Sequence, residues 1–243
     1  MFRLWAWDGN PDRAPLFGMD VIVGRALRTE TPIFVEEMRE VIFRPYWNVP
    51  PGILRHEVVP KIVRDADYLR RENMEIVRGA GDDGRSLEPA AETLDALRRG
   101  QLRLRQRPGV HNALGLIKFD FPNRENVYMH GTPAQALFAR SRRDFSHGCV
   151  RVADPVALAE WAHEELPDWN RDRILAATLG SATIHVRLAR PIQVILFYTT
   201  AAVMPEDGTI RFAEDIYGHD ARLDRALAAK SRASAVPDER TLG

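Results

Sequence analysis

The stretches Val127-Tyr128-Met129-His130-Gly131-Thr132-Pro133 and Phe145-Ser146-His147-Gly148-Cys149-Val150-Arg151 are the most informative parts of this 243-residue sequence. Val127 to Met129 has the pattern of a strand, so His130 lies at the end of a rigid element that can aim its side chain. Cys149 is the only cysteine, and it lies between two turn-like segments beside glycine and histidine. A lone cysteine is most often a small buried hydrophobe, but this context is not that of a core residue.

The neighbours of Cys149 predict nucleophilic chemistry. A thiol becomes a good nucleophile when an adjacent base or a positive field favours the thiolate. His130 and His147 are candidates for the base, although His147 need not meet Cys149 across a tight turn. Gly148 leaves room for a substrate carbonyl to approach the backbone, where N–H groups can serve as an oxyanion hole. A reactive thiol of low pKa would distinguish a catalytic Cys149 from an inert one.

Composition argues against several classes of protein. The chain carries 34 basic and 34 acidic residues, and this zero net charge argues against a nucleic-acid partner and against electrostatic attachment to an anionic membrane. No apolar run approaches the roughly 20 residues that span a bilayer. The N-terminus, Met1-Phe2-Arg3-Leu4-Trp5, lacks the pattern of a signal peptide.

No metal or cofactor site is predicted. One cysteine allows neither an intramolecular disulfide nor a multi-cysteine zinc site. His56-Glu57 and His163-Glu164-Glu165 lack the second histidine at i+4 that a helical zinc motif requires. The sequence contains no phosphate-binding glycine loop and no dinucleotide fingerprint.

The order of elements predicts a mainly β protein with several helices, of the α+β class. Residues 1–50 read as strands that end in the proline-rich loop Tyr46-Trp47-Asn48-Val49-Pro50-Pro51. Residues 53–106 change character, with helical spacing in Val59–Asn73 and Pro89–Arg99 around a flexible glycine-rich break. This segment is predicted to be a helical insertion.

The remaining elements follow from caps and turn residues. Thr132 to Arg140 is expected to be a short helix with Thr132 as its N-cap, and Asp154 is expected to cap the helix that Pro155 opens. Strands are predicted at 183–188 and 192–198, followed by a hairpin turn at Asp207-Gly208.

Here the residues resemble a known family. His130, followed after 15 residues by Ser146-His147-Gly148-Cys149, resembles the signature of the L,D-transpeptidases with a YkuD-type catalytic domain. Their signature is a histidine followed at this spacing by [S/T]-H-G-C-x-[N/R]. The segments that resemble the large, YcbB-like branch are Tyr46-Trp47-Asn48-Val49-Pro50-Pro51, Asn112-Ala113-Leu114-Gly115, Phe121-Pro122-Asn123 and Asp215-Ile216-Tyr217-Gly218. The resemblance runs from about residue 2 to about residue 228.

The resemblance implies a domain plan. Residues 1–52 and 107–228 would form a YkuD-like β-sandwich or barrel catalytic domain. Residues 53–106 would be a helical capping insertion that holds the substrate, and residues 229–243 a disordered polar tail.

It also implies a reaction. These enzymes attack the carbonyl of the third residue of a peptidoglycan tetrapeptide stem with a cysteine thiolate and release the terminal D-alanine. The thioester then passes to the side-chain amine of another stem, which gives a 3→3 cross-link. The implied partners are donor and acceptor stem peptides, with carbapenem β-lactams as inhibitors, and the implied location is the periplasm or cell envelope.

Carried over, the family pattern assigns roles to particular residues. Cys149 is the nucleophile, and His130 is its base and later its acid. The backbone carbonyl of Gly131 orients the imidazole, and Gly148 with the Cys149 N–H forms the oxyanion region. The expected substrate-binding residues are Tyr128, Trp47, Ser146, His147 and Arg151. For His147 a purely structural role fits the sequence about as well, and for Arg151 a structural role fits slightly better.

Two other functions stay open. The same acyl-enzyme could be given to water, as in an L,D-carboxypeptidase, or used to release a protein from peptidoglycan. Alternatively the chain could be a non-catalytic wall-binding module. The intact pair of His130 and Cys149 argues against the last reading, because a binding module has no chemical need of either residue.

Overall fold

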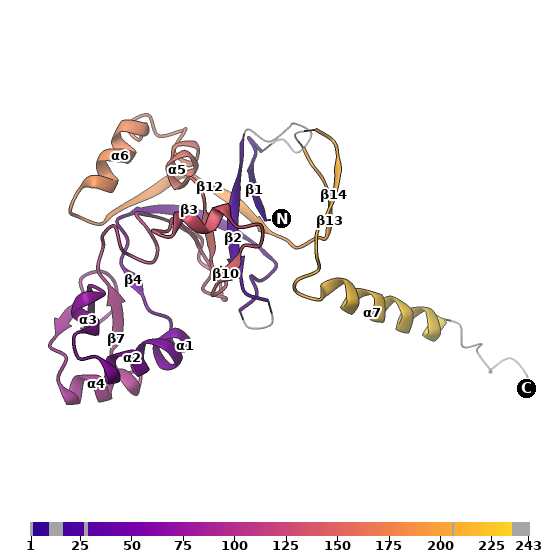
Figure 1. The fold of residues 1–243 in the computed structure, drawn as a ribbon. Coiled ribbons are helices and arrows are strands. Elements are labelled where there is room, and N and C mark those ends of the chain that lie inside the picture. The colour runs from indigo at the N-terminus through magenta and orange to yellow at the C-terminus, as the bar shows by residue number, and fades with distance from the viewer. Residues whose placement is uncertain (1, 10–16, 27–28, 206, 235–243) are drawn as a thin grey trace, which may run out of the picture.

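Eight strands form one mixed sheet at the centre of the computed structural model, which describes residues 2–9, 17–26, 29–205 and 207–234 (Figure 1). The strand order is β1-β2-β11-β9-β8-β3-β12, and β10 pairs with β2 beside this path. The strands are β1 (Arg3–Ala6), β2 (Phe17–Gly24), β3 (Phe34–Phe43), β8 (Ile117–Asp120), β9 (Met129–His130), β10 (Asp144–Ser146), β11 (Val150–Val152) and β12 (Ile184–Leu196). A mixed sheet with several helices agrees with the α+β class expected from the sequence.

One face of this sheet carries the main hydrophobic core. Side chains alternate between the two faces along a strand, and Val41, Phe119, Met129 and Val150 all belong to the buried cluster. Helices α5 (Pro155–Ala162) and α6 (Arg171–Leu179) contribute to the same cluster. The core therefore holds the central strands by one face, while the other face carries polar side chains such as Lys118 together with the buried Ile22 and Ile42.

Helix α5 begins as the sequence predicts. Asp154 accepts a hydrogen bond from the backbone N–H of Ala157 at 2.9 Å, and Pro155 occupies the first helical position. His163 ends this helix and is almost fully buried, stacked on Phe43, with Nδ1 2.8 Å from the carbonyl of Ala159. These contacts give His163 a place in the core.

The helix predicted at Thr132–Arg140 is shorter than expected and is not capped by Thr132. A 3-10 helix covers only Gln135–Ala139 (η2), and Ala134 precedes it without a side-chain cap. The hydroxyl of Thr132 instead accepts from the N–H of Ala134 at 3.2 Å, which closes a local turn. Threonine competes for nearby backbone groups in this way, so its presence before a proline does not fix where a helix begins.

Residues 47–106 form a second unit, called the cap below, which lies to one side of the main sheet (Figure 1). Its sheet has the order β4-β7-β5-β6, and its helices lie around a separate hydrophobic cluster that includes Ile76, Leu97 and Leu104. The strands are β4 (Trp47–Asn48), β5 (Met74–Arg78), β6 (Arg85–Leu87) and β7 (Arg103–Gln106). The helical segments are α1 (Pro51–Ile53), the π-helix η1 (Leu54–Val58), α2 (Val59–Arg64), α3 (Tyr68–Arg71) and α4 (Ala91–Arg98).

The cap is therefore a mixed α/β unit and not the helical insertion predicted from the sequence. Helical spacing ends before Asn73, whose positive φ of 52° stops the chain from continuing as a helix. Met74–Arg78 then forms a strand with three consecutive buried residues, and residues 79–84 are the loop of a hairpin. A strand that short carries no alternation for a periodicity argument to detect.

A buried ion pair holds the loop of residues 79–84. Arg105 Nε donates to Glu75 Oε1 at 2.8 Å, and both side chains are less than a tenth exposed. The same guanidinium donates to the carbonyls of Asp82 at 2.8 Å and Gly84 at 3.2 Å and lies 4.0 Å from the Tyr46 ring centre. Arg105 thus fixes the backbone that presents Asp82 to the main sheet.

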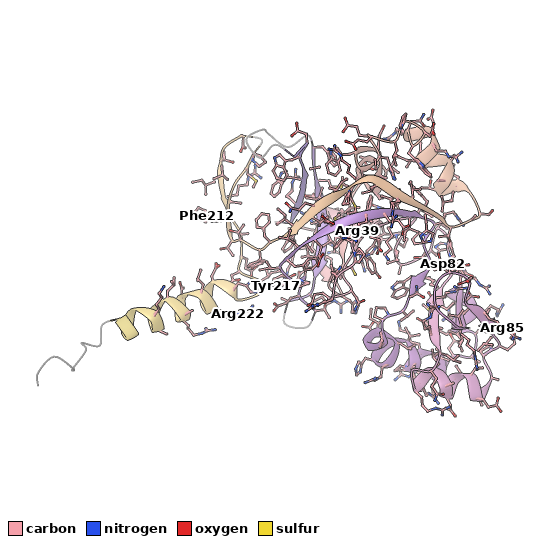
Figure 2. The ribbon with its side chains drawn as sticks, turned by 180° about the vertical axis from the view of Figure 1, so that it is seen from behind. Arg39, Asp82, Arg85, Phe212, Tyr217 and Arg222 are labelled. Atoms are coloured by element: carbon pink, nitrogen blue, oxygen red, sulfur yellow. The ribbon has the colours of Figure 1, made fainter. Side chains whose placement is uncertain are left out.

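Two histidines of the main unit meet carboxylates of the cap. His185 on β12 lies between Glu40 of β3, 3.1 Å from Nδ1, and Asp82 of the cap, 2.8 Å from Nε2. His147 Nε2 lies 2.7 Å from Glu57 Oε1 of η1. Figure 2 shows Asp82 on the side of the cap that faces the sheet.

The C-terminal part contains one bent strand, a hairpin and a projecting helix. Strand β12 spans both predicted segments, with a register shift between Arg187 and Ile192. The predicted turn at Asp207-Gly208 lies between β13 (Ala201–Val203) and β14 (Ile210–Phe212). The Tyr217 hydroxyl donates to the Gly24 carbonyl at 2.8 Å just before α7 (His219–Ser234), which extends away from the body (Figures 1 and 2).

The predicted tail of residues 229–243 needs a correction. Residues 229–234 continue helix α7, which contains no proline or glycine to end it. Residues 235–243 lie outside the described residues. Among the described residues, no helix is long and apolar enough to cross a membrane.

We expect docking of the cap loop to weaken as the pH rises. Partial burial opposes the charged form of His185, but Asp82 and Glu40 outweigh it and raise its pKa above the ordinary value of about 6.5. Only an imidazolium donates from both nitrogens. The stabilisation is therefore complete below the ordinary pKa and lost as the pH passes the raised one. Hydrogen exchange of residues 79–84, corrected for intrinsic rates, should accelerate across this interval.

The variant His185→Lys keeps a positive charge throughout this pH interval, so the acceleration of hydrogen exchange should disappear. His185→Gln should show fast exchange throughout. A pH step of unchanged size in His185→Gln would assign the effect to another group.

Candidate active site

The pairing of β9 with β11 gathers four of the predicted residues on one face of the sheet. The two strands are parallel, with Val150 opposite Met129 and Arg151 opposite His130. Met129 and Val150 point into the core, so His130 and Arg151 point to the other face. Tyr128 lies on the side of His130, with ring centroids 5.7 Å apart. Cys149 immediately precedes β11 on the same side as Arg151.

His130 is buried and neutral. Its side chain is enclosed at the end of β9, and Nδ1 lies 2.5 Å from the carbonyl oxygen of Gly131. Since a carbonyl only accepts, Nδ1 carries the proton and Nε2 keeps a free lone pair. Burial, with the positive charge of Arg151, lowers the pKa of His130 to about 3 against the opposing effect of the Gly131 and Leu114 carbonyls. The imidazole is thus a pre-oriented proton acceptor.

Gly115 allows the backbone beside His130 to pack closely. It has a φ of +66°, and a Cβ at this position would lie 2.7 Å from both Gly131 C and Thr132 N. Gly115 belongs to a segment that resembles the family, but its sequence context predicts no function for it. The signal was its place three residues after Asn112, whose buried side chain accepts from the Leu114 N–H at 2.8 Å and donates to the Pro45 carbonyl at 3.1 Å.

Ser146 shapes the turn that presents Cys149. Its hydroxyl donates to the Cys149 carbonyl at 2.6 Å and accepts from the Gly148 N–H at 3.2 Å. Gly148 has a φ of +109°, which favours glycine, and its carbonyl accepts from the Thr31 hydroxyl at 2.9 Å. The Gly148 N–H is therefore occupied. The Cys149 N–H has no acceptor in the described part of the chain, so it is the N–H available for an oxyanion.

The structure places Cys149 near His130 but does not pair them. The thiol donates instead to the carbonyl of Asn126, with Sγ 3.8 Å from the oxygen. Burial raises the pKa of the Cys149 thiol, although Tyr128, Lys118 and Arg151 oppose this shift. The free protein therefore holds a neutral thiol and a neutral imidazole on one face of the sheet, and the low thiol pKa that the sequence offers as the mark of a catalytic cysteine is not found before substrate binds.

Tyr128 links the nucleophile to the cap. Its hydroxyl lies close enough to the Cys149 thiol and to the side chain of Trp47 on β4 for both to influence its ionisation, while burial raises the Tyr128 pKa well above its usual range. Lys118 was missed by sequence reasoning. It lies opposite His130 on β8, with Nζ 4.4 Å from the Tyr128 ring centre and 2.7 Å from Asp120. The only signal for it was the rarity of lysine in this arginine-rich chain.

His147 points to the cap and does not contact Cys149. Its partner Glu57 was considered in the sequence only as part of a metal motif and set aside. In the structure, the His147–Glu57 contact connects η1 to the turn that carries the nucleophile. No group of three or more histidine, cysteine or acidic side chains in the described ranges is placed to hold a metal ion.

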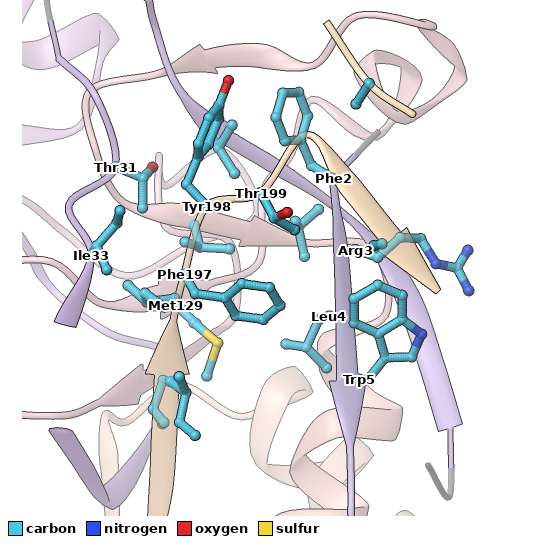
Figure 3. Close-up of a pocket in the computed structure, with 18 of the residues that line it drawn as sticks. Phe2, Arg3, Leu4, Trp5, Thr31, Ile33, Met129, Phe197, Tyr198 and Thr199 are labelled. Atoms are coloured by element: carbon cyan, nitrogen blue, oxygen red, sulfur yellow. The ribbon is translucent and has the colours of Figure 1, made fainter. Parts of the chain in front are cut away.

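A large apolar cavity lies on the core side of the sheet and not at Cys149 (Figure 3). It encloses about 710 Å³, and neither Cys149 nor His130 lines it. Its labelled lining residues include Phe2, Leu4, Trp5, Met129 and Phe197. Met129 thus separates this cavity from the polar face that carries its neighbour His130.

Comparison with known proteins identifies the family. Residues 2–186 match the family model described as YkuD, the L,D-transpeptidase catalytic domain. The chain is also 32% identical over 209 residues to a protein of Haemophilus influenzae named "Putative L,D-transpeptidase". The match covers 85% of this chain and 41% of that relative, so the chain spans less than half of its length. The chain belongs to the YkuD family of L,D-transpeptidase catalytic domains, which confirms the resemblance found in the sequence.

Replacing Gly115 with alanine should destabilise the protein more than the same change at Gly100. Both glycines have φ near +70°, so each substitution costs about 1–2 kcal/mol for the left-handed backbone. Only at Gly115 does the new Cβ also strike the Gly131 backbone. Urea unfolding of Gly115→Ala and Gly100→Ala measures the difference, and equal losses would show that the close contact costs nothing.

Alkylation of Cys149 by iodoacetamide should be slow at pH 7 and should rise steadily with pH, because burial holds the thiol neutral. Tyr128→Phe should move the rise to higher pH, since the hydroxyl favours the thiolate. Tyr198→Phe is the matched control, because it removes a tyrosine hydroxyl that donates to Asp215 and not one that acts on Cys149. A rate plateau between pH 5 and pH 7 in the wild type would indicate a preformed thiolate.

Proposed function

We propose that this chain is a peptidoglycan L,D-transpeptidase that forms 3→3 cross-links through a thioester at Cys149. The observation that carries the proposal is the placement of Cys149 and a neutral His130 on one face of the sheet, with the imidazole fixed by Gly131. Membership of the YkuD family supports the same chemistry. The donor is a tetrapeptide stem, and the acceptor is the side-chain amine of a second stem.

Acylation begins with two neutral groups. The Cys149 thiol turns from Asn126 towards His130, whose Nε2 takes the proton as sulfur attacks the carbonyl carbon of the third stem residue. The Cys149 N–H donates to the developing oxyanion. The His130 imidazolium then gives its proton to the departing amine of D-alanine. The nearby positive charge of Arg151 and Lys118 disfavours that imidazolium and so promotes the second transfer.

Deacylation repeats these roles with a new nucleophile. The acceptor amine attacks the thioester carbon while His130 removes one of its protons. Collapse of the tetrahedral intermediate breaks the bond to sulfur, and His130 returns the proton to the thiol. One amide bond is broken and one is made, and the products are D-alanine and the cross-linked stem.

The surrounding residues would bind the stems and exclude water. Tyr128 interacts with Trp47 of the cap and with Cys149, so both aromatic side chains would line the stem-binding site. The contact of Glu57 with His147 closes the cap onto the nucleophile turn. A covered site suits transfer to an amine, because water competes for the same thioester. We propose the periplasm or cell envelope as its location, since the substrate lies there.

Carbapenems should acylate Cys149, because the strained β-lactam carbonyl presents the same electrophile as the donor stem. Intact-protein mass spectrometry should show one adduct in the wild type and none in Cys149→Ala. His130→Ala should slow adduct formation by roughly 10²–10⁴-fold, the usual contribution of a general base. His111→Ala removes an exposed histidine and is the control. An adduct on Cys149→Ala would contradict the assignment.

The acceptor decides between the candidate reactions. With a disaccharide tetrapeptide as the only substrate, a transpeptidase gives a dimer with loss of one D-alanine per bond. An L,D-carboxypeptidase gives the tripeptide monomer instead. Binding without any product would indicate a wall-binding module. Separation of the products by liquid chromatography and mass spectrometry distinguishes these three outcomes.

A further inference from the structure

Arg151 is a largely buried arginine without a partner. It lies on β11 opposite His130, on the face that carries Cys149. Only its Nε is enclosed, and this atom has no acceptor; the two terminal nitrogens are not enclosed and form no hydrogen bond or ion pair within the described part of the chain. Burial accordingly lowers the pKa of Arg151 from its ordinary value.

Other enclosed arginines in this protein are satisfied. Arg105 pairs with Glu75 and donates to three carbonyls. Arg143 donates to Asp20 at 3.0 Å and to the carbonyls of Val21, Phe2 and Arg140. Arg44, whose Nε also lacks an acceptor, still donates from Nη1 to Thr178. Among these four arginines, only Arg151 forms no hydrogen bond with any nitrogen of its guanidinium group.

The charges around Arg151 do not compensate it. Arg25 lies close enough to repel it, His130 is neutral, and Cys149 would attract it only as a thiolate. Lys118, on the other side of His130, already pairs with Asp120. A buried cation is costly unless an anion pairs with it. The free protein therefore presents an anion site beside the nucleophile that its own side chains do not fill.

We infer that Arg151 binds the terminal carboxylate of the donor stem, on the D-amino acid that leaves. This inference rests on the proposed function. Cys149 and Arg151 are two residues apart, about 7 Å along an extended chain. In a stem that ends one residue beyond the scissile bond, the terminal carboxylate lies three bonds from the carbonyl carbon under attack. A guanidinium can hold that carboxylate in two parallel hydrogen bonds.

This contact would determine which stems act as donors. A stem with one more residue places a neutral amide where the carboxylate belongs and leaves Arg151 buried and unpaired. The penalty for such a mismatch is large, because a polar site rejects a ligand that cannot pair with it. After acylation the carboxylate departs with the leaving amino acid, and the site next to the thioester empties before the acceptor arrives.

The test compares three donors that differ only in their carboxylates. The first is the tetrapeptide with a free terminal acid, the second has a terminal carboxamide, and the third keeps the terminal acid but has an amidated side-chain carboxyl on its third residue. In the wild type, kcat/KM should fall roughly 100-fold for the second donor, as for loss of a buried charge pair. It should change little for the third.

The enzyme variants are Arg151→Gln, Arg151→Lys and, as a matched control, Arg124→Gln, which removes an exposed arginine. Arg151→Gln should act equally on acid and carboxamide donors. Arg151→Lys should recover part of the preference for the acid, whereas Arg124→Gln should retain all of it. Thermal melting of each variant confirms that it is folded.

Direct binding separates this inference from the proposed function. In Cys149→Ala, which cannot form a thioester, titration calorimetry should show tighter binding of the acid donor than of the carboxamide. The added change Arg151→Gln should abolish that difference. Such a result supports the carboxylate site even if no cross-linking is detected. An acid preference that survives Arg151→Gln, or one that follows the side-chain carboxyl, overturns the inference while the transpeptidase assignment stands.

Discussion

The parallel pairing of β9 with β11 is the constraint on which the site depends. Because Val150 lies opposite Met129 and both are buried, the register of the two strands is set by the core. His130 and Arg151 are then forced to the polar face. A slip of one residue would exchange the faces, placing the imidazole in the core and Met129 in solvent. The hydrophobic core therefore positions the candidate catalytic groups without contacting them.

Burial sets the resting state of this site. It keeps His130 and the Cys149 thiol neutral, so reaction must create charge only when a substrate is present. Lys118 lies against the Tyr128 ring and pairs with Asp120, which keeps a cation near the thiol without leaving it unpaired. Arg151 is the exception, because it has no hydrogen-bond or ion-pair partner in the described part of the chain. This lack is informative because Lys118, the other cation near His130, does have a partner.

Sequence reasoning reached the residues whose signal is local. The spacing of His130 and Cys149, the Asp154 cap and the hairpin turn at Gly208 depend on a few adjacent residues. It missed β5 of the cap sheet, because this strand pairs with β7 across about 30 residues and its short run has no periodicity. Glu57 and Lys118 gain their places only from folding, which brings them to His147 and His130. Thr132 failed as a cap because a nearby turn competed for its hydroxyl.

The cap adds acidic side chains above a site proposed to bind a carboxylate, and this arrangement requires compensation. Both of its carboxylates at the interface are engaged by histidines of the main unit, Glu57 by His147 and Asp82 by His185. Glu75, the buried carboxylate of the cap, pairs with Arg105 and Arg107. With these partners, none of the three carboxylates pairs with Arg151. The closed cap can therefore cover the site without supplying the anion that Arg151 lacks, which leaves that place to the substrate.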